Sequence, residues 1–274
     1  MIPIGPMRAL ACATILFAGA TIAHAQTSTQ KGNPVSSAPP EAVKQFTPTG
    51  KLRAAINLGN PVLAQGTPDA PRGITVDLAR ELAKRIGAEL TLVPFDGAGK
   101  VFEALKANAW DVAFLAIEPV RAAEIAFTAP YVLIEGVYMV PKDSALKSVA
   151  EVDAKGVRIG VNKGSAYDLF LTRTLKNATL VRGENGVALF AKEKLEATAG
   201  VKQPMVGYAK EHPEVRIIDG RFMEIRQAMG TPQGRDAAAA YLKTFVEEMK
   251  ASGFVADALK RSDQPDAAVA PAER

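Results

Sequence analysis

The sequence contains few of the side chains on which disulfides, metal centres and covalent catalysis depend. It has one cysteine, Cys12, and two histidines, His24 and His212. Cys12 and His24 lie in an N-terminal segment with the pattern of a leader, so the remaining chain would have no thiol and one histidine. His212 precedes Pro213 and is interpreted as a surface residue near a helix end. We therefore expect no disulfide, no metal site, no Ser–His pair and no cofactor.

Strong charge of one sign is also missing. The formal net charge is +4 for 33 basic and 29 acidic residues, and removal of Arg8 with the leader would lower it by one. No run of basic residues is interleaved with aromatic residues, so nucleic acid is not expected as a partner. The chain after the leader, roughly 250 residues, is long enough for two domains of ordinary size.

The first 25 residues have the pattern of a secretory signal peptide. Arg8 precedes an apolar stretch, and the small residues Ala23 and Ala25 flank His24 at an expected cleavage site. The apolar stretch from Ala9 to Ala23 is shorter than the roughly 20 residues of a membrane span. A lipoprotein signal at Cys12 is the alternative, but no apolar segment of useful length precedes that cysteine. Export to the periplasm is expected.

Two terminal segments are typical of unstructured chain. Residues 26–45 are rich in Ser, Thr, Pro and Gln and are predicted to be a disordered linker. Residues 263–274 contain Pro, Ala and charged residues and are predicted to be a disordered tail.

Between these segments, short apolar runs alternate with helical patterns. Residues 52–57 are predicted to form a strand, and residues 75–87 a helix that ends at Gly87. Further helices are expected near 101–109, 165–176, 187–197 and 233–251, and buried strands near 111–117 and 157–162. This repetition of strand and helix predicts an α/β protein with a mostly parallel sheet.

The strand–helix rhythm occurs twice, before about residue 135 and after about residue 156. We therefore expect two α/β lobes. Lobe 1 is predicted to comprise residues 46–139 and 228–262, and lobe 2 residues 140–227. The segments 135–144 and 222–230 are interpreted as the two crossings between the lobes.

Several phrases recur together in one known family. GITVDL (73–78), WDVAFLAI (110–117), Arg121 and IAFTAPY (125–131) occur in order, and GVRIGVNKGSA (156–166) follows. In this combination the chain resembles the family 3 solute-binding proteins of bacterial ABC importers over nearly all of residues 51–262. The resemblance implies a type II periplasmic-binding-protein fold, with two lobes joined by two hinge crossings around a ligand cleft. It also implies a small anionic or zwitterionic solute and an inner-membrane ABC permease as partners, and a monomer.

The resemblance also assigns a ligand site. In the family, the arginine at the place of Arg121 clamps the ligand's carboxylate, a task that suits the planar guanidinium fork. Ser165 and Ala166 begin a helical pattern, so their N–H groups are expected to point into the cleft as anion donors. Phe95 ends a strand and is a candidate cleft aromatic. The full set of expected ligand-binding residues is Arg121, Ser165, Ala166, Asn162, Asn57, Asn60, Phe95, Ala116 and Phe114.

This chain departs from the family where amino acids are bound by their ammonium group. The acidic residues usually found there are replaced by Asn57 and Val201, and the usual hydroxyl and aromatic residues by Ala116 and Asn60. A buried ammonium without a carboxylate partner costs several kcal/mol. We therefore expect a carboxylate that lacks an α-amino group, with Asn57, Asn60 and Asn162 as neutral partners. Glu196 or Gln203 reaching the cleft is the open alternative.

No catalytic residue is expected, but two other functions stay open. Some proteins of this fold, such as periplasmic cyclohexadienyl dehydratases, catalyse eliminations, and Glu118 is the nearest acid or base for such a reaction. A third possibility is a soluble module that feeds a separate receptor.

Overall fold

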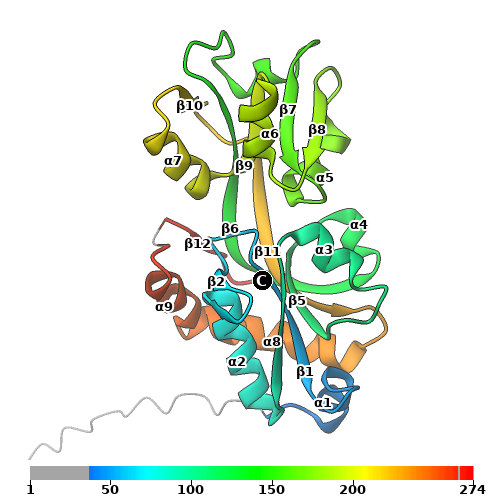
Figure 1. The fold of residues 1–274 in the computed structure, drawn as a ribbon. Helices are drawn as coiled ribbons and strands as arrows, with labels where there is room; N and C mark the ends of the chain where they lie inside the picture. Colours follow the sequence, from blue (N-terminus) through cyan, green and yellow to red (C-terminus); the bar gives the residue numbers. More distant parts are fainter. Residues whose placement is uncertain (1–36, 265, 274) are drawn as a thin grey trace, which may run out of the picture. The chain divides into compact units, whose positions relative to one another are not determined.

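The computed structural model describes residues 37–264 and 266–273, which form one compact unit from Ser37 onwards. The predicted signal peptide and residues 26–36 of the predicted linker lie outside the described residues. The strands of the large sheet follow the order β4-β1-β5-β11-β6-β9-β7-β8. Two long strands, β6 (Ile125–Pro141) and β11 (Met223–Pro232), form the middle of this sheet and join its two halves (Figure 1).

Lobe 1 is built on the first half of the sheet. Its strands β1, β4 and β5 run parallel, and β5 pairs antiparallel with β11. These strands are β1 (Leu52–Asn57), β4 (Leu90–Phe95) and β5 (Val112–Ala116), with the separate hairpin β2 (Gln65–Thr67) and β3 (Ala70–Arg72). The helices are α1 (Pro40–Phe46), α2 (Ile74–Ile86), α3 (Ala98–Glu103), α4 (Pro119–Ala122), α8 (Asp236–Ala251) and α9 (Phe254–Arg261).

Lobe 2 is built on the second half. Its strands β9, β7 and β8 run parallel, and β9 and β10 both pair antiparallel with β6. These strands are β7 (Arg158–Asn162), β8 (Thr179–Gly183), β9 (Ala197–Val201) and β10 (Val215–Ile217). The helices are the 3₁₀ turn η1 (Val149–Val152), α5 (Ala166–Thr174), α6 (Gly186–Glu193) and α7 (Lys202–Glu211).

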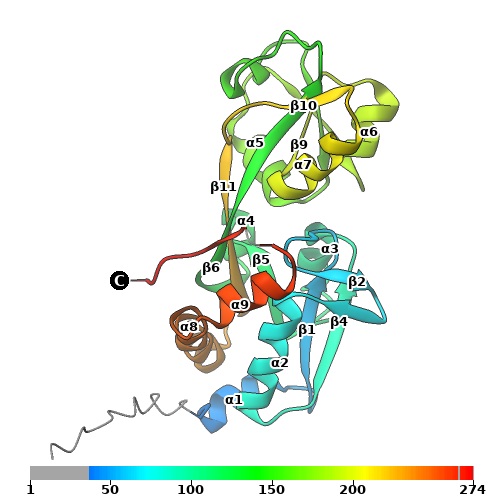
Figure 2. The same cartoon turned by 90° about the vertical axis from the view of Figure 1, so that its left-hand side faces the viewer.

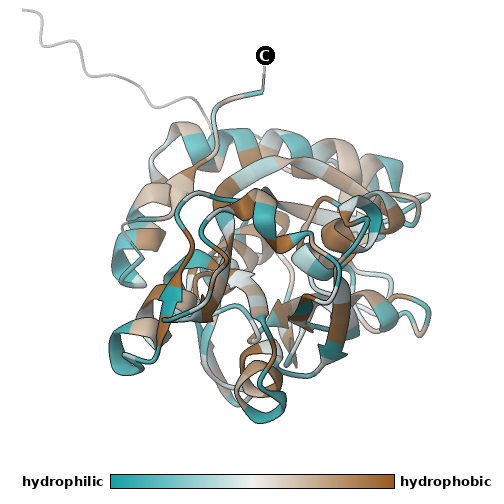
Figure 3. Cartoon of the chain, turned by 90° about the horizontal axis from the view of Figure 1, so that it is seen from above, coloured by the Kyte–Doolittle hydropathy of each residue, from teal (hydrophilic) through white to brown (hydrophobic). Residues whose placement is uncertain are grey.

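The amphipathic pattern of α2 shows how the sequence forms this fold. Its predicted apolar stripe, which includes Val76, Leu78 and Leu82, is buried against the sheet. Gly87 ends the helix in the left-handed conformation, with φ 66°, where a side chain would be strained. Hydrophobic and hydrophilic residues alternate along the helices in the same way elsewhere (Figure 3). The predicted helix and its end are confirmed.

The terminal segments differ from the prediction. The last residues of the predicted linker, from Pro40, form α1, whose Ala42 and Phe46 are buried. At the other end, β12 (Ala268–Val269) pairs with Leu133 and Val132 of β6. Figure 2 shows the C-terminal segment running beside β6. The prediction of disorder is wrong for residues 40–45 and for residues 268–269, because these residues pack on lobe 1, a contact that local composition does not reveal.

Several predicted boundaries also move. The helix expected near 101–109 begins at Ala98 and ends at Glu103, and Asn108 takes a left-handed conformation. The helix expected from residue 233 begins at Asp236, because Gly234 has a positive φ in the preceding turn. The crossing segments 135–144 and 222–230 overlap β6 and β11, which pair with both lobes. The residue limits of the two lobes stay a prediction.

Candidate functional site

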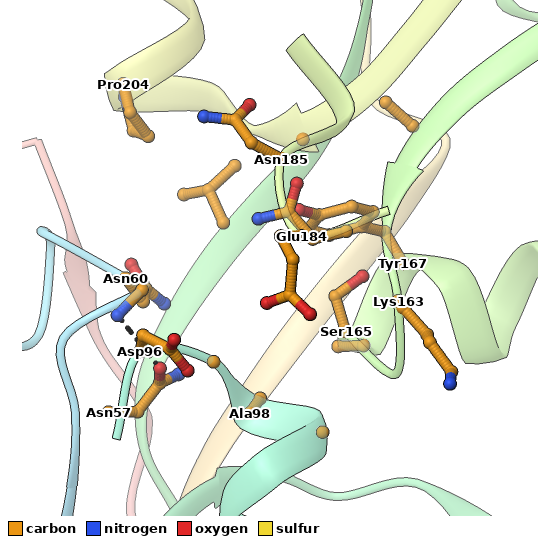
Figure 4. A pocket seen from close by; sticks show the side chains of 18 of the residues that line it. Asn57, Asn60, Asp96, Ala98, Lys163, Ser165, Tyr167, Glu184, Asn185 and Pro204 are labelled. Carbon is orange, nitrogen blue, oxygen red and sulfur yellow. Dashed lines mark hydrogen bonds between the residues drawn. The ribbon is translucent and has the colours of Figure 1, made fainter. Parts of the chain in front are cut away.

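A cavity of about 670 Å³ lies between residues of lobe 1 and lobe 2. Lobe 1 contributes the segments that follow β1, β4 and β5, and lobe 2 contributes the starts of α5, α6 and α7. Figure 4 shows Asn57, Asn60 and Asp96 on one side of this space and Glu184, Ser165 and Tyr167 on another. The carboxyl ends of parallel strands meet here, which is where α/β proteins bind their ligands.

Arg121 supplies a buried positive charge to this cavity. It follows β5 in the short helix α4, and only 1% of its surface is exposed. Two of its guanidinium nitrogens donate to backbone carbonyls, Nη1 to Ala116 at 3.0 Å and Nη2 to Gly164 at 2.8 Å. Its Nε has no partner among the described residues. Arg121, the predicted carboxylate clamp, is among the residues that line the cavity, and its unpaired Nε is itself buried.

Burial lowers the pKa of Arg121 to about 10, and the nearby Glu118 carboxylate opposes this effect in part. The guanidinium therefore stays protonated at neutral pH. A buried cation with spare donors favours an anionic partner, because its desolvation is not fully compensated by neutral carbonyls.

At the start of α5, more of the backbone N–H groups are hydrogen-bonded within the protein than predicted. The Ser165 hydroxyl accepts the N–H of Asp168 at 3.1 Å, so Ser165 is the N-cap, as expected. However, its own N–H donates to the Asn162 carbonyl, and the Asp168 carboxylate accepts the N–H of Gly164. The prediction of a free Ser165 N–H is wrong, because the tight turn before the helix uses it. Among the described first-turn groups, the N–H groups of Ala166 and Tyr167 remain for a ligand.

The three predicted asparagines line the cavity, and each has its side-chain oxygen occupied. Asn57 accepts the N–H of Gly59 at 3.0 Å, Asn60 that of Val62 at 3.3 Å, and Asn162 that of Gly186 at 2.8 Å. The group that each can offer a ligand is therefore the amide NH₂, a donor. Ala116 also lines the cavity.

Two predicted contacts are not supported by the structure. Phe95 packs against the lobe 1 cluster that includes Trp110 and Leu115, and Phe114 is 1% exposed, edge-on to Tyr131 with ring centroids 6.3 Å apart. Neither belongs to the lining of the cavity. The physical reason is strand alternation together with burial, which turn both rings into the core. We correct the prediction of a ligand contact for both residues.

The two lobes touch directly around the cavity. Besides the bond from Arg121 to the Gly164 carbonyl, Lys100 of α3 pairs with Asp96 at 2.7 Å and with Glu184 of lobe 2 at 3.0 Å. Gly99 lies so close to the turn before α5 that an added Cβ would be 2.9 Å from the Lys163 carbonyl. These contacts join the two lobes beside the cavity.

Glu118 also joins the two lobes, through an ion pair. Its carboxylate is 3% exposed and forms an ion pair with Arg173 of α5 at 2.5 Å. It does not belong to the lining of the cavity. The acid proposed for an enzymatic alternative therefore faces a cation of the partner lobe.

Sequence reasoning missed Gln227, which comes from the hinge strand β11. It lies opposite Ala116 in the strand register, lines the cavity, and is 6% exposed. Its Oε1 is buried without a partner among the described residues. No local motif distinguishes this glutamine, and its position depends on the pairing of β11 with β5.

Within residues 37–264 and 266–273, no group of three or more His, Cys, Asp or Glu side chains is placed to hold a metal ion. In the same part of the chain, none of the helices combines the length and hydrophobicity needed to cross a bilayer.

Comparison with known proteins identifies the family. Residues 52–261 match the family described as bacterial extracellular solute-binding proteins, family 3. The chain belongs to this family. The family 3 proteins are solute-binding proteins of ABC importers, so the family expected from the sequence phrases is confirmed.

Individual family 3 proteins are distant relatives. The histidine-binding periplasmic protein of Escherichia coli K12 is 28% identical over 197 residues, which cover 66% of this chain and 75% of that protein. Among solved structures, an amino acid ABC transporter substrate-binding protein from Streptococcus pneumoniae, bound to L-arginine, has 20% identity and a TM-score of 0.68. That match covers 81% of this chain and 98% of the other.

An ancestral amino acid-binding protein, described as a precursor of cyclohexadienyl dehydratase, has 20% identity and a TM-score of 0.66. The match covers 80% of this chain and 98% of the ancestral protein's chain. At such identities these structures establish the fold, that of the type II periplasmic binding proteins, with two α/β lobes joined by two hinge strands.

Proposed function

We propose that this protein is the periplasmic solute-binding component of an ABC importer and captures a small carboxylate that lacks an α-amino group. The observation that carries the proposal is the set of groups around the cavity. Arg121, the Ala166 N–H and the asparagine NH₂ groups are all hydrogen-bond donors. A ligand that fits donors on several sides is an anion with few donors of its own.

The positions of the acidic residues in the described lining support the same conclusion. Asn57 and Val201, at the places of the usual acidic residues, both line the cavity. Of the acidic residues in the lining, Asp96 and Glu184 share the Lys100 ammonium, and Glu103 is exposed at the end of α3. An α-ammonium would have to compete with that lysine, at a cost in desolvation.

The two residues that left this question open do not line the main cavity. Glu196 forms a pair of bonds with the Arg158 guanidinium, at 2.9 Å each. Gln203 lines a separate cavity of about 610 Å³. Neither is placed to supply a counter-charge to a ligand at Arg121.

A zwitterionic amino acid is the alternative ligand, since the relatives named above bind histidine and L-arginine. The alternative activity is that of a lyase such as cyclohexadienyl dehydratase. It is disfavoured by the ion pair that holds Glu118 against Arg173. The proposed partners are the inner-membrane permease and the solute, with the binding protein acting as a monomer.

A thermal-shift screen of L-amino acids, 2-keto acids and 2-hydroxy acids tests the proposal. We expect stabilisation by keto or hydroxy acids and little by amino acids. Strong stabilisation by an ordinary amino acid contradicts the proposed ligand class. Product formation from prephenate or arogenate, lost in Glu118→Gln, would instead establish the lyase.

A further inference from the structure

The cavity extends well beyond the groups that would hold a carboxylate. In Figure 4, Pro204 and Ser165 lie well apart, on opposite sides of the view. Pro204 belongs to the first turn of α7, and Ser165 caps α5. A volume of about 670 Å³ is in the range of pockets for drug-sized ligands. A carboxylate and its α-substituent would fill only one end of this space.

The end beside α7 is lined by apolar side chains. Val201 ends β9, Pro204 lies in the first turn of α7, and Met205 is the next residue; all three line the cavity. Met205 is 3% exposed and packs on Gly200, where an added Cβ would lie 2.9 Å from its sulfur. This close packing fixes the methionine, so the floor of this end is a formed surface.

An aromatic pair completes the α7 end of the cavity. The rings of Tyr208 and His212 are stacked, with centroids 3.9 Å apart and an interplanar angle of 15°, and both residues line the cavity. His212 Nδ1 lies 3.0 Å from a carboxylate oxygen of Glu214, which holds the imidazole in place. The stack in turn holds the tyrosine ring, so the aromatic surface exists before a ligand arrives.

The charged side chains of α7 are directed elsewhere. Lys202 pairs with Glu135 at 2.5 Å, and both Lys202 and Lys210 line the other cavity. Of the lobe 1 residues labelled in Figure 4, the neutral Asn60 lies nearest to Pro204, with Asp96 beside it. Val201, Pro204, Met205 and Tyr208 therefore form an apolar subsite, here called the α7 subsite.

The geometry points to an elongated monocarboxylate as the ligand, with an uncharged apolar or aromatic group in the α7 subsite. This inference rests on the proposed function, because it takes the carboxylate to lie at Arg121. It adds a second determinant: the tail opposite the carboxylate contributes affinity by leaving water for the α7 subsite. A second charge on that tail would be desolvated among the apolar side chains of the α7 subsite.

Isothermal titration calorimetry with ligands that share one head group tests this. The series is lactate, 2-hydroxy-4-methylpentanoate and 3-phenyllactate, with malate and 6-amino-2-hydroxyhexanoate as charged-tail controls. We expect the affinity to rise at least roughly tenfold from lactate to 3-phenyllactate, since burying such a ring removes a large apolar area from water. Malate and 6-amino-2-hydroxyhexanoate should bind more weakly than 3-phenyllactate.

Two variants locate the effect at the α7 subsite. Tyr208→Ala should remove most of the gain in affinity from lactate to 3-phenyllactate, so it should weaken 3-phenyllactate far more than lactate. Tyr208→Phe, which retains the ring, should preserve the gain. Circular dichroism and thermal melts establish whether both variants are folded. A third variant, Val201→Asp, should weaken the binding of ligands with apolar tails and does not change the Tyr208–His212 stack.

The outcomes separate this inference from the proposed function. If hydroxy acids bind through Arg121 but with affinities independent of the tail, or if Tyr208→Ala and Val201→Asp leave the tail dependence intact, the α7 subsite is wrong and the proposed function stands. If neither the hydroxy acids of the series nor the matching 2-keto acids bind, the proposed ligand class fails and this inference fails with it. Tighter binding of malate or 6-amino-2-hydroxyhexanoate than of 3-phenyllactate overturns the inference and leaves the proposed function standing.

Discussion

The two sides of the cavity that would share a carboxylate differ in how far their hydrogen-bonding and charged groups are already paired within the protein. On the lobe 1 side, Arg121 is a buried cation that still has unused N–H groups, including Nε. On the lobe 2 side, the start of α5 already contains its own anion, Asp168, which accepts the Gly164 N–H and pairs with Arg182 at 2.8 Å. The helix start of lobe 2 is thus largely satisfied without a ligand.

This difference indicates how the work of binding is divided. Lobe 1 has the larger unmet electrostatic demand, so it should supply most of the free energy of binding a carboxylate. Lobe 2 adds a few N–H groups, the hydrogen bond from Arg121 to its Gly164 carbonyl, and apolar surface. We expect the variants below to divide along the same line.

Arg121→Lys should have the largest effect. A lysine keeps the charge but loses the planar fork, so ligand affinity should fall roughly 100-fold or more. Calorimetry measures this, with Arg221→Lys as the control, since Arg221 pairs with Glu135 and Glu224 away from the cavity. An affinity within threefold of the parent would place the carboxylate somewhere other than at Arg121.

Gln227→Leu should separate stability from binding. Removing a buried amide with an unpaired Oε1 should raise the melting temperature of the ligand-free protein, because an unsatisfied buried polar atom costs about 1–3 kcal/mol. Ligand affinity should fall roughly three- to tenfold through loss of a hydrogen bond. Ligand-free melts and calorimetry check the two parts; unchanged affinity would remove Gln227 from the site.

Ser165→Ala should cost about 1 kcal/mol of stability through loss of the α5 N-cap, and a few-fold in affinity, because the first-turn N–H groups are less well fixed. Ser148→Ala, at the cap of η1, is the control. It should lower stability without changing affinity. Denaturant unfolding and calorimetry together distinguish the two, and equal affinities would show that α5 contributes nothing to the anion.

Lys100→Met tests the exposed bridge between the lobes. The Lys100 side chain is 46% exposed and that of Glu184 80%, so solvent screens this ion pair. Affinity should fall less than about threefold, and the difference should shrink at high salt. Calorimetry at low and high ionic strength checks this. A large and salt-independent loss would mean that the bridge, rather than the ligand, controls closure.

The dependence of binding on pH should be the smallest effect near neutrality. The pKa of Arg121 is lowered to about 10, and a ligand carboxylate titrates near 4, so both groups stay charged between them. Affinity should be constant from about pH 6 to 8.5. The affinity should decline as the pH rises through the pKa of Arg121, because the cation is lost. It should also decline as the pH falls toward the pKa of the ligand carboxylate, because the anion is lost. A titration centred near neutrality would indicate a different group.

Much of lobe 1 and the place of Arg121 could be predicted from the sequence. The buried stripe of α2 and the run ending at Ala116 are local patterns, and the arginine follows that run directly. By contrast, helix α7 was not predicted, because a proline inside a segment usually indicates that no helix forms there. Pro204 lies in the first turn of α7, where the proline's missing N–H removes no helical hydrogen bond. Phe95 and Phe114 were assigned to the cleft because strand position alone does not say which face of a strand is covered.

The sequence by itself determined the family, the alternation of strands and helices, and the arginine that follows the buried strand β5. Only the tertiary structure decided what surrounds that arginine. It placed the Gly164 carbonyl on the guanidinium, turned Glu118 toward Arg173, and aligned Gln227 with Ala116. These contacts join residues far apart in the chain. They depend on how the lobes pack and how the hinge strands pair, which no local pattern of residues encodes.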